Sequence, residues 1–172
     1  GRHRKEMYNS SYTGTFSVRY KTDMSAFDLG ETYIYYDGDH FGNLVWSKDS
    51  LSLNNEYLFV DKTNPYMWYN NTGIKKDNTF FARQSTDLND HLNIYAEAQL
   101  RNIDYSIFGT ESDREDIDFH EKYLFCNPKL GLNYVINDNQ RLYFVSGIVS
   151  REPTRSDIKE SYLEGDSMMA ET

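Results

Sequence analysis

The segment from Leu92 to Arg101 alternates between apolar and polar side chains more regularly than any other part of the chain. Its apolar positions are Leu92, Ile94, Ala96, Ala98 and Leu100, and its polar positions are Asn93, Tyr95, Glu97, Gln99 and Arg101. Successive side chains of a β-strand point to opposite faces, so this period of two predicts a strand with one apolar and one polar face. A soluble sheet would bury the apolar face in its core. A membrane barrel would turn it to lipid and the polar face to an aqueous lumen, and the period alone leaves both open.

Three segments of extended pattern fold back on themselves as predicted hairpins, at residues 13–36, 79–104 and 127–150. Each has a short run of turn-forming residues near its middle, at 21–25, 87–90 and 137–140. Pro153 ends the last hairpin, because proline has no N–H to give to a ladder. We therefore expect an all-β fold whose antiparallel strands follow one another as an up-and-down meander.

The predicted connections alternate between short turns and long polar segments, which run over residues 37–72 and 105–122. Outer-membrane barrels sort their loops in this way, with short periplasmic turns and longer extracellular loops. The long segments are acidic: residues 37–72, 104–122 and 151–172 carry −11 of the net charge of −9, which leaves +2 for the rest. This asymmetry favours a membrane barrel over a soluble sheet, and the overall acidity argues against nucleic acid as a partner.

The composition fits a β-rich protein that performs no chemistry of its own. Only 38% of the residues are hydrophobic but 16% are aromatic, and disordered chains lack aromatic residues. Cys126 is the single cysteine, so an intrachain disulfide is excluded. No apolar run is long enough for a membrane helix, and residues 1–7 do not resemble a signal peptide, so an exported chain would be part of a longer protein. The sequence contains no nucleophile elbow, phosphate loop or paired-histidine motif, and we expect neither an enzyme nor a cofactor.

Several segments resemble the barrel of TonB-dependent outer-membrane receptors, in the same order along the chain. The matching stretches are YYDGDHFGNLVW (35–46), WYNNTGIKKD (68–77), LNIYAEAQLRNIDYSIFGT (92–110), NPKLGLNY (127–134), LYFVSGIVS (142–150) and REPTRSD (151–157). The resemblance covers about residues 10–160. It implies part of a 22-stranded barrel in the outer membrane of a Gram-negative cell, without the plug domain through which such receptors contact the TonB complex. It also implies uptake of a siderophore, cobalamin or glycan, with a surface lipoprotein as a further partner.

Four residues of the first long connection are candidate ligand contacts: Asp39, His40, Trp68 and Tyr69. Aromatic rings beside amides can stack on a flat or sugar ligand. Trp and Tyr also form the interfacial girdles of membrane barrels, and for this cluster we favour such a girdle or packing within the loop. Metal binding by Asp37, Asp39 and His40, or by His120 with Asp116, Asp118 and Glu121, is disfavoured because an acidic solvated loop explains both clusters. Arg151, Glu152, Arg155 and Asp157 are expected to pair across neighbouring strands inside the lumen.

Two other functions remain open from the sequence. The first is a soluble β-sheet module that binds glycans through the aromatic segment 65–71. The second is a complete eight-stranded membrane barrel with an adhesive or structural role, for which the chain length is suitable but the strand pattern is uneven.

Overall fold

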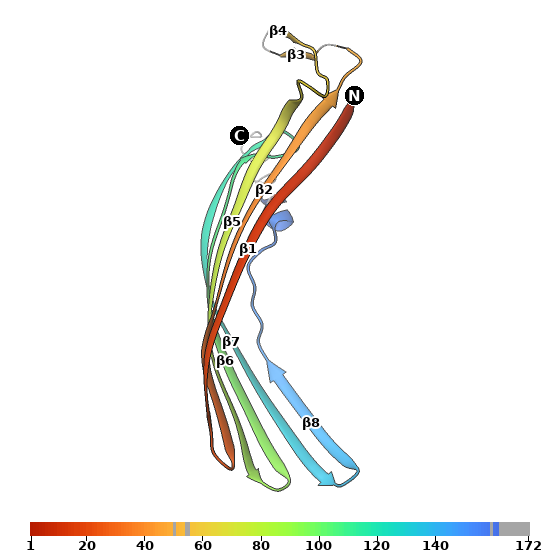
Figure 1. The fold of residues 1–172 in the computed structure, drawn as a ribbon. Helices are drawn as coiled ribbons and strands as arrows, with labels where there is room; N and C mark the ends of the chain where they lie inside the picture. The colour runs from red at the N-terminus through yellow and green to blue at the C-terminus, as the bar shows by residue number, and fades with distance from the viewer. Residues whose placement is uncertain (50, 54–55, 159, 162–172) are drawn as a thin grey trace, which may run out of the picture.

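In the computed structural model, which describes residues 1–49, 51–53, 56–158 and 160–161, the chain forms one long antiparallel sheet (Figure 1). The sheet order is β1-β2-β5-β6-β7-β8. The strands are β1 (Arg2–Lys21), β2 (Ser25–Trp46), β5 (Tyr66–Asn89), β6 (Leu92–Thr110), β7 (Asp116–Asn137) and β8 (Gln140–Gly147). A small hairpin of β3 (Leu51–Leu53) and β4 (Glu56–Leu58) lies between β2 and β5. The predicted all-β antiparallel meander is therefore confirmed, and over the described residues the sheet is open, with β1 and β8 at its edges.

The strands run much farther than the sequence pattern predicted, and the two long irregular connections are shorter than expected. Between β2 and β5 only residues 47–65 lie outside the main sheet, and between β6 and β7 only residues 111–115 do. The expectation of irregular chain over 37–72 and 105–122 is wrong, because residues such as Asp37 and Gly38 continue the ladder with β1 and β5 despite their turn-forming chemistry. At the other end β8 stops at Gly147, earlier than the expected 150.

Gly42 illustrates why a turn-forming residue can lie within a strand. A Cβ atom at this position would lie 2.6 Å from two ring atoms of Trp68 and would also collide with the Tyr69 ring. Glycine is therefore required at position 42 so that two aromatic rings can cover the backbone, a close approach that a sequence pattern cannot distinguish from a turn.

The sheet bends along its strands, so it has a convex and a concave face (Figure 1). After β8 the chain turns back and crosses the concave face (Figure 1); we call residues 148–158 the strap. The strap ends in a helical turn at residues 155–158, where Ile158 is 3% exposed and packs on Ile107 and Ile117 of the sheet. No helix among the described residues has the length and apolarity to cross a membrane.

Gly109 provides a test of the backbone near the end of β6. Its φ is +117°, and a Cβ atom there would lie 2.8 Å from the Cα of Asn71 on the paired strand. We expect Gly109→Ala to lower the free energy of unfolding by about 1–3 kcal/mol, because alanine at this φ is strained and its methyl group meets backbone. Urea unfolding of the two proteins measures the difference. Gly14→Ala is the matched control, since nothing lies within 4 Å of its Cβ position; an equal loss in both variants would contradict the explanation.

Candidate functional site

The convex face carries a broad surface of exposed apolar side chains, which we call the belt. Strand pairing places its members on one face, where each is 41–72% exposed. They are Phe16, Val18 and Tyr20 of β1, Phe27, Leu29 and Tyr33 of β2, Phe80 of β5, Leu100 of β6, Leu124, Leu130, Leu132 and Tyr134 of β7, and Leu142 and Phe144 of β8. Ile94, Ala96 and Ala98 continue it along β6, whereas Glu31 and Gln84 interrupt it. The belt extends over all six strands of the main sheet.

The belt has a sharp border on the side of the longer connections. Five residues lie directly opposite one another on neighbouring strands there: Tyr12, Tyr35, Lys76, Asp104 and Lys122. The rings of Tyr12 and Tyr35 are in contact, with centroids 6.4 Å apart. Asp104 of this row pairs with its neighbour Lys122 at 3.4 Å and with His120 at 2.9 Å. Charged side chains therefore replace the apolar ones of the belt within two to four residues along β5, β6 and β7.

One row of the concave face alternates in charge across five strands. Arg19, Asp28, Arg83, Glu97 and Lys129 lie directly opposite one another from β1 to β7. Opposite charges in facing positions stabilise a sheet, and two neighbours in this row form ion pairs, Arg19 with Asp28 at 2.5 Å and Arg83 with Glu97 at 3.4 Å. The polar face predicted for β6 therefore belongs to a charged surface that the whole sheet shares.

The first part of the strap follows β7 and is held there by hydrogen bonds. The Ile148 N–H donates to the Pro128 carbonyl at 3.0 Å, and the Ser150 N–H donates to the Asn127 side-chain oxygen at 2.8 Å. The Asn127 side-chain amide donates back to the Ser150 carbonyl. The two bonds between Asn127 and Ser150 keep the chain beside β7 after the ladder between β7 and β8 has ended.

Two charged residues attach the rest of the strap to the concave face. Glu152 forms ion pairs with Lys75 and with Arg101, and Arg101 also forms an ion pair with Asp77. Side-chain exposure in this group is 28% or less, so water screens it only in part. Glu152 and Arg155 are therefore paired as expected, with β5, β6 and the 111–115 connection, but they pair from the strap and not from a strand, because β8 ends before them.

Arg155 of the strap links three parts of the molecule. Its Nη2 donates to the side-chain oxygen of Asn71, which is 2% exposed, and to a carboxylate oxygen of Glu111. Thr154 caps the helical turn: its hydroxyl accepts from the Asp157 N–H at 3.3 Å, and its own N–H donates to the Asp157 carboxylate at 2.7 Å.

The four predicted ligand contacts are divided between the two faces at the loop end of the sheet. Asp39 lies on the convex face and accepts a hydrogen bond from Thr72 at 2.6 Å. His40 lies on the concave face opposite Asn71, and Tyr69 lies opposite Gly42 on the same face. Trp68 is the extra residue of a β-bulge between Gly42 and Asn43, and for that reason its ring covers Gly42 beside the ring of Tyr69. Three of the four residues, His40, Trp68 and Tyr69, therefore lie together, whereas Asp39 lies on the other face of the sheet.

The aromatic cluster at this end joins strands that are distant in sequence. The ring of His3 meets the Trp68 ring edge-on, with centroids 5.0 Å apart, and the Lys5 ammonium lies 5.8 Å from the centre of the Tyr69 ring. Tyr69 is 8% exposed, so its ring is packed against neighbouring groups and leaves little free surface on which a ligand could stack. Asp37 and Asp39 lie on the opposite face of the sheet from His40, and no group of three metal-ligating side chains is found among the described residues.

His40 gives the loop end a dependence on pH. Burial lowers the pKa of its imidazole below the ordinary value, and the Arg155 guanidinium lowers it further, while Glu111 and Asp39 act in the opposite direction. The unfolded chain binds this proton near pH 6.5 but the folded chain binds it only at lower pH, so stability is expected to fall as the pH drops below about 6.5. His40→Gln should remove this slope, which for one proton is at most about 1.4 kcal/mol per pH unit. Thermal unfolding from pH 7.5 to 5 measures it, and an unchanged profile in the variant would refute the assignment.

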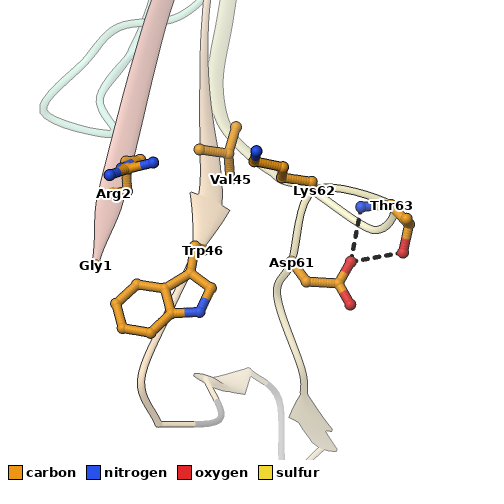
Figure 2. A pocket seen from close by; sticks show the side chains of 7 residues that line it. All are labelled: Gly1, Arg2, Val45, Trp46, Asp61, Lys62 and Thr63. Atoms are coloured by element: carbon orange, nitrogen blue, oxygen red, sulfur yellow. Dashed lines mark hydrogen bonds between the residues drawn. The ribbon is translucent and has the colours of Figure 1, made fainter.

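A cavity of about 670 Å³ opens at the loop end, where β1 begins and β2 ends (Figure 2). Val45 is the extra residue of a second bulge, between the pairs His3–Leu44 and Arg2–Trp46. Figure 2 shows Arg2 and Lys62 on opposite sides of Val45, with the Trp46 ring beneath them. Trp46 is 50% exposed. Arg2 and Lys62 come together only through the return of the chain from β4 to β5, which no local pattern in the sequence reveals.

A comparison of the chain with models of known protein families gives no match, and a comparison with curated proteins gives none either. The function must therefore be argued from the two faces and the rim of the sheet.

Proposed function

We propose that this chain is a wall segment of a TonB-dependent outer-membrane receptor, which captures a nutrient and passes it inward without catalysis. The observation that carries the proposal is the distribution of side chains on a single curved sheet: an aliphatic and aromatic belt on the convex face, and alternating charges on the concave face. Membrane barrels have this arrangement, with lipid outside and a polar lumen inside. The convex face would then contact lipid and the concave face would line the lumen.

The height of the belt supports this assignment. It runs for nine residues along β6, from Leu92 to Leu100, and for eleven along β7, from Leu124 to Tyr134. At about 3.4 Å per residue these stretches measure about 27–34 Å, or about 21–26 Å across a bilayer when a strand tilts by about 40°. The apolar band of an outer-membrane barrel is about 25 Å tall. Tyr12 and Tyr35 at one border and Tyr20, Phe27 and Tyr134 toward the other correspond to the two aromatic girdles.

The same belt argues against the soluble glycan-binding module. Monomeric soluble proteins rarely expose continuous apolar patches larger than a few hundred Å², and large patches mark membrane or protein contacts. A soluble sheet would place its largest apolar side chains in a core, whereas the small cluster around Ile107, Ile117 and Ile158 lies under the strap on the opposite face. Within the described residues, no second sheet or helix packs against the belt.

The remaining parts of the receptor follow from the open edges of the sheet. Strands β1 and β8 each have one side free of ladder partners in the described residues, and such edges call for pairing. In the proposed receptor further strands of a 22-stranded barrel pair with them, and a plug domain fills the lumen and contacts the TonB complex. The ligand, a siderophore, cobalamin or glycan, would meet the loop end first, and a surface lipoprotein could cover that end.

The accessibility of Cys126 tests the proposal directly. Cys126 is exposed and pairs with Leu100, which places it on the convex face within the belt. In the full-length protein in intact cells, with any other cysteine replaced, a membrane-impermeant maleimide should fail to label Cys126 while a lipophilic maleimide succeeds. Lys48→Cys in a Cys126→Ser background is the control, because residue 48 is exposed after β2 and should react with both reagents. Equal labelling of Cys126 by both reagents would refute a lipid-facing belt.

A further inference from the structure

We infer that the cavity between Arg2, Trp46 and Lys62 is a binding site for an acidic sugar, a uronic-acid residue of an oligosaccharide. The inference rests on the proposed function in one respect, because it assigns the first contact with the ligand to the outer rim of the barrel. It goes beyond that function by naming the ligand's chemical class and the side chains that recognise it.

The walls of this cavity are fixed by the backbone on both sides. On one side the bulge at Val45 changes the register between β1 and β2, so that Arg2 faces Trp46 directly. On the other side the Ser47 N–H donates to the Val60 carbonyl at 3.2 Å, and Val60 is 4% exposed. The returning chain is therefore attached to the end of β2. Bulges of this kind redirect side chains at sheet ends and beside binding sites.

A tight turn positions Lys62 and one oxygen of Asp61. Asp61 Oδ1 accepts hydrogen bonds from the Thr63 N–H at 2.7 Å, the Thr63 hydroxyl at 2.6 Å and the Asn64 N–H at 2.9 Å. These bonds lower the pKa of Asp61, so the carboxylate is charged at neutral pH. Within the described residues no group donates to Asp61 Oδ2, which stays free to accept from a ligand (Figure 2).

The charges of the cavity select an anion. Arg2 and Lys62 have no ion-pair partner in the described part of the chain, although the whole chain carries a net charge of −9. Five other cations, by contrast, are paired with carboxylates: Arg19, Lys75, Arg83, Arg101 and Arg155. Two uncompensated cations on opposite sides of one opening fit a carboxylate, to which Arg can donate two hydrogen bonds and Lys one.

The remaining groups restrict the anion to a sugar. Trp46 offers a half-exposed ring on which the apolar face of another ring can pack. Asp61 Oδ2 can only accept, so the ligand must also carry a hydroxyl that donates. A ring with both a carboxylate and hydroxyl groups meets all three demands, whereas a neutral sugar would leave the cations unpaired and a simple aromatic acid would leave Asp61 without a donor.

The test compares two matched ligands with the full-length protein in detergent: a trimer of galacturonic acid and its methyl ester. The ester keeps the rings and hydroxyls but removes the charges. Isothermal titration calorimetry at low salt should show binding of the acid at least about tenfold tighter than of the ester, since a charge-assisted hydrogen bond is worth more than a neutral one. The difference should shrink as salt is added.

Variants of the cavity separate the roles of its side chains. Arg2→Gln combined with Lys62→Gln should weaken binding of the acid about tenfold or more and leave the ester nearly unaffected. Trp46→Ala should weaken both ligands, and Trp46→Phe should recover part of the loss. Lys48→Gln is the matched control, because Lys48 is an exposed lysine of the same connection that does not line the cavity.

Three results would overturn the inference: no binding of the acid at millimolar concentration, equal binding of acid and ester, or unchanged affinity in the Arg2/Lys62 and Trp46→Ala variants. These results are independent of the labelling of Cys126. A protein whose belt is shielded by lipid but which ignores uronides would retain the receptor function and lose the sugar site. A water-soluble protein that binds uronides would do the reverse.

Discussion

Ala98→Arg is expected to lower the free energy of unfolding of the lipid-inserted protein by about 2–4 kcal/mol, the cost of an arginine on the lipid face near the bilayer midplane. Ala98 is exposed on the convex face and lies opposite Ala82 and Pro128, in the middle of the belt. No acidic side chain lies in this row to compensate the new charge. The same reasoning applies to Ala96→Lys, which lies one row nearer the turns.

The measurement is urea unfolding of the full-length protein folded into phospholipid vesicles, together with the assembled fraction in the outer membrane of cells. Gln99→Arg is the matched control, since Gln99 is the next residue of β6 and lies on the concave face beside Glu97. It should assemble like the parent protein. If both arginine variants assemble equally well, the assignment of the convex face to lipid is wrong.

Arg101→Leu is expected to cost about 2–3 kcal/mol of stability and to release the strap. Arg101 bonds to Asp77 and to Glu152, and its removal leaves two carboxylates with 5% and 11% exposure short of a partner. Breaking a fully buried pair typically costs about 3–5 kcal/mol, and the 23% exposure of the Arg101 side chain argues for a smaller effect. Lys75 remains to pair with Glu152, so the strap should loosen more than the sheet itself.

Two measurements test whether the strap is released in the Arg101→Leu variant. Urea unfolding gives the loss of stability, and limited digestion with trypsin should cut faster after Arg151 and Arg155 in the variant than in the parent protein. Arg19→Leu is the control, because Arg19 also pairs with an aspartate on the concave face but its side chain is 69% exposed. Exposed pairs contribute about 1 kcal/mol or less. Equal losses in both variants, or an unchanged digestion rate, would show that the network does not hold the strap.

The sequence by itself determined the strand class and the order of the hairpins. The alternation along residues 92–101 predicted a two-faced strand, and the turn residues at 137–140 predicted a reversal, which the β7–β8 turn confirms at residues 138–139. Both features are local, since the period of side chains and the chemistry of a tight turn depend only on neighbouring residues. They were insufficient for strand ends, because Gly38 and Gly42 have turn chemistry but lie in a ladder.

Only the tertiary structure decided which residues share a surface. The alternating charges of Arg19, Asp28, Arg83, Glu97 and Lys129 come from five strands and depend on the register of each pair. Trp68 lies beside Tyr69 over Gly42 because of a one-residue bulge, since a shift by one residue turns a side chain to the other face. Glu152 reaches Arg101, 51 residues earlier in the chain, because the strap returns over the concave face of the sheet (Figure 1). The period of the sequence determines which side chains of a strand share a face. The register between strands and the return of the chain over the sheet determine which side chains of other strands they contact.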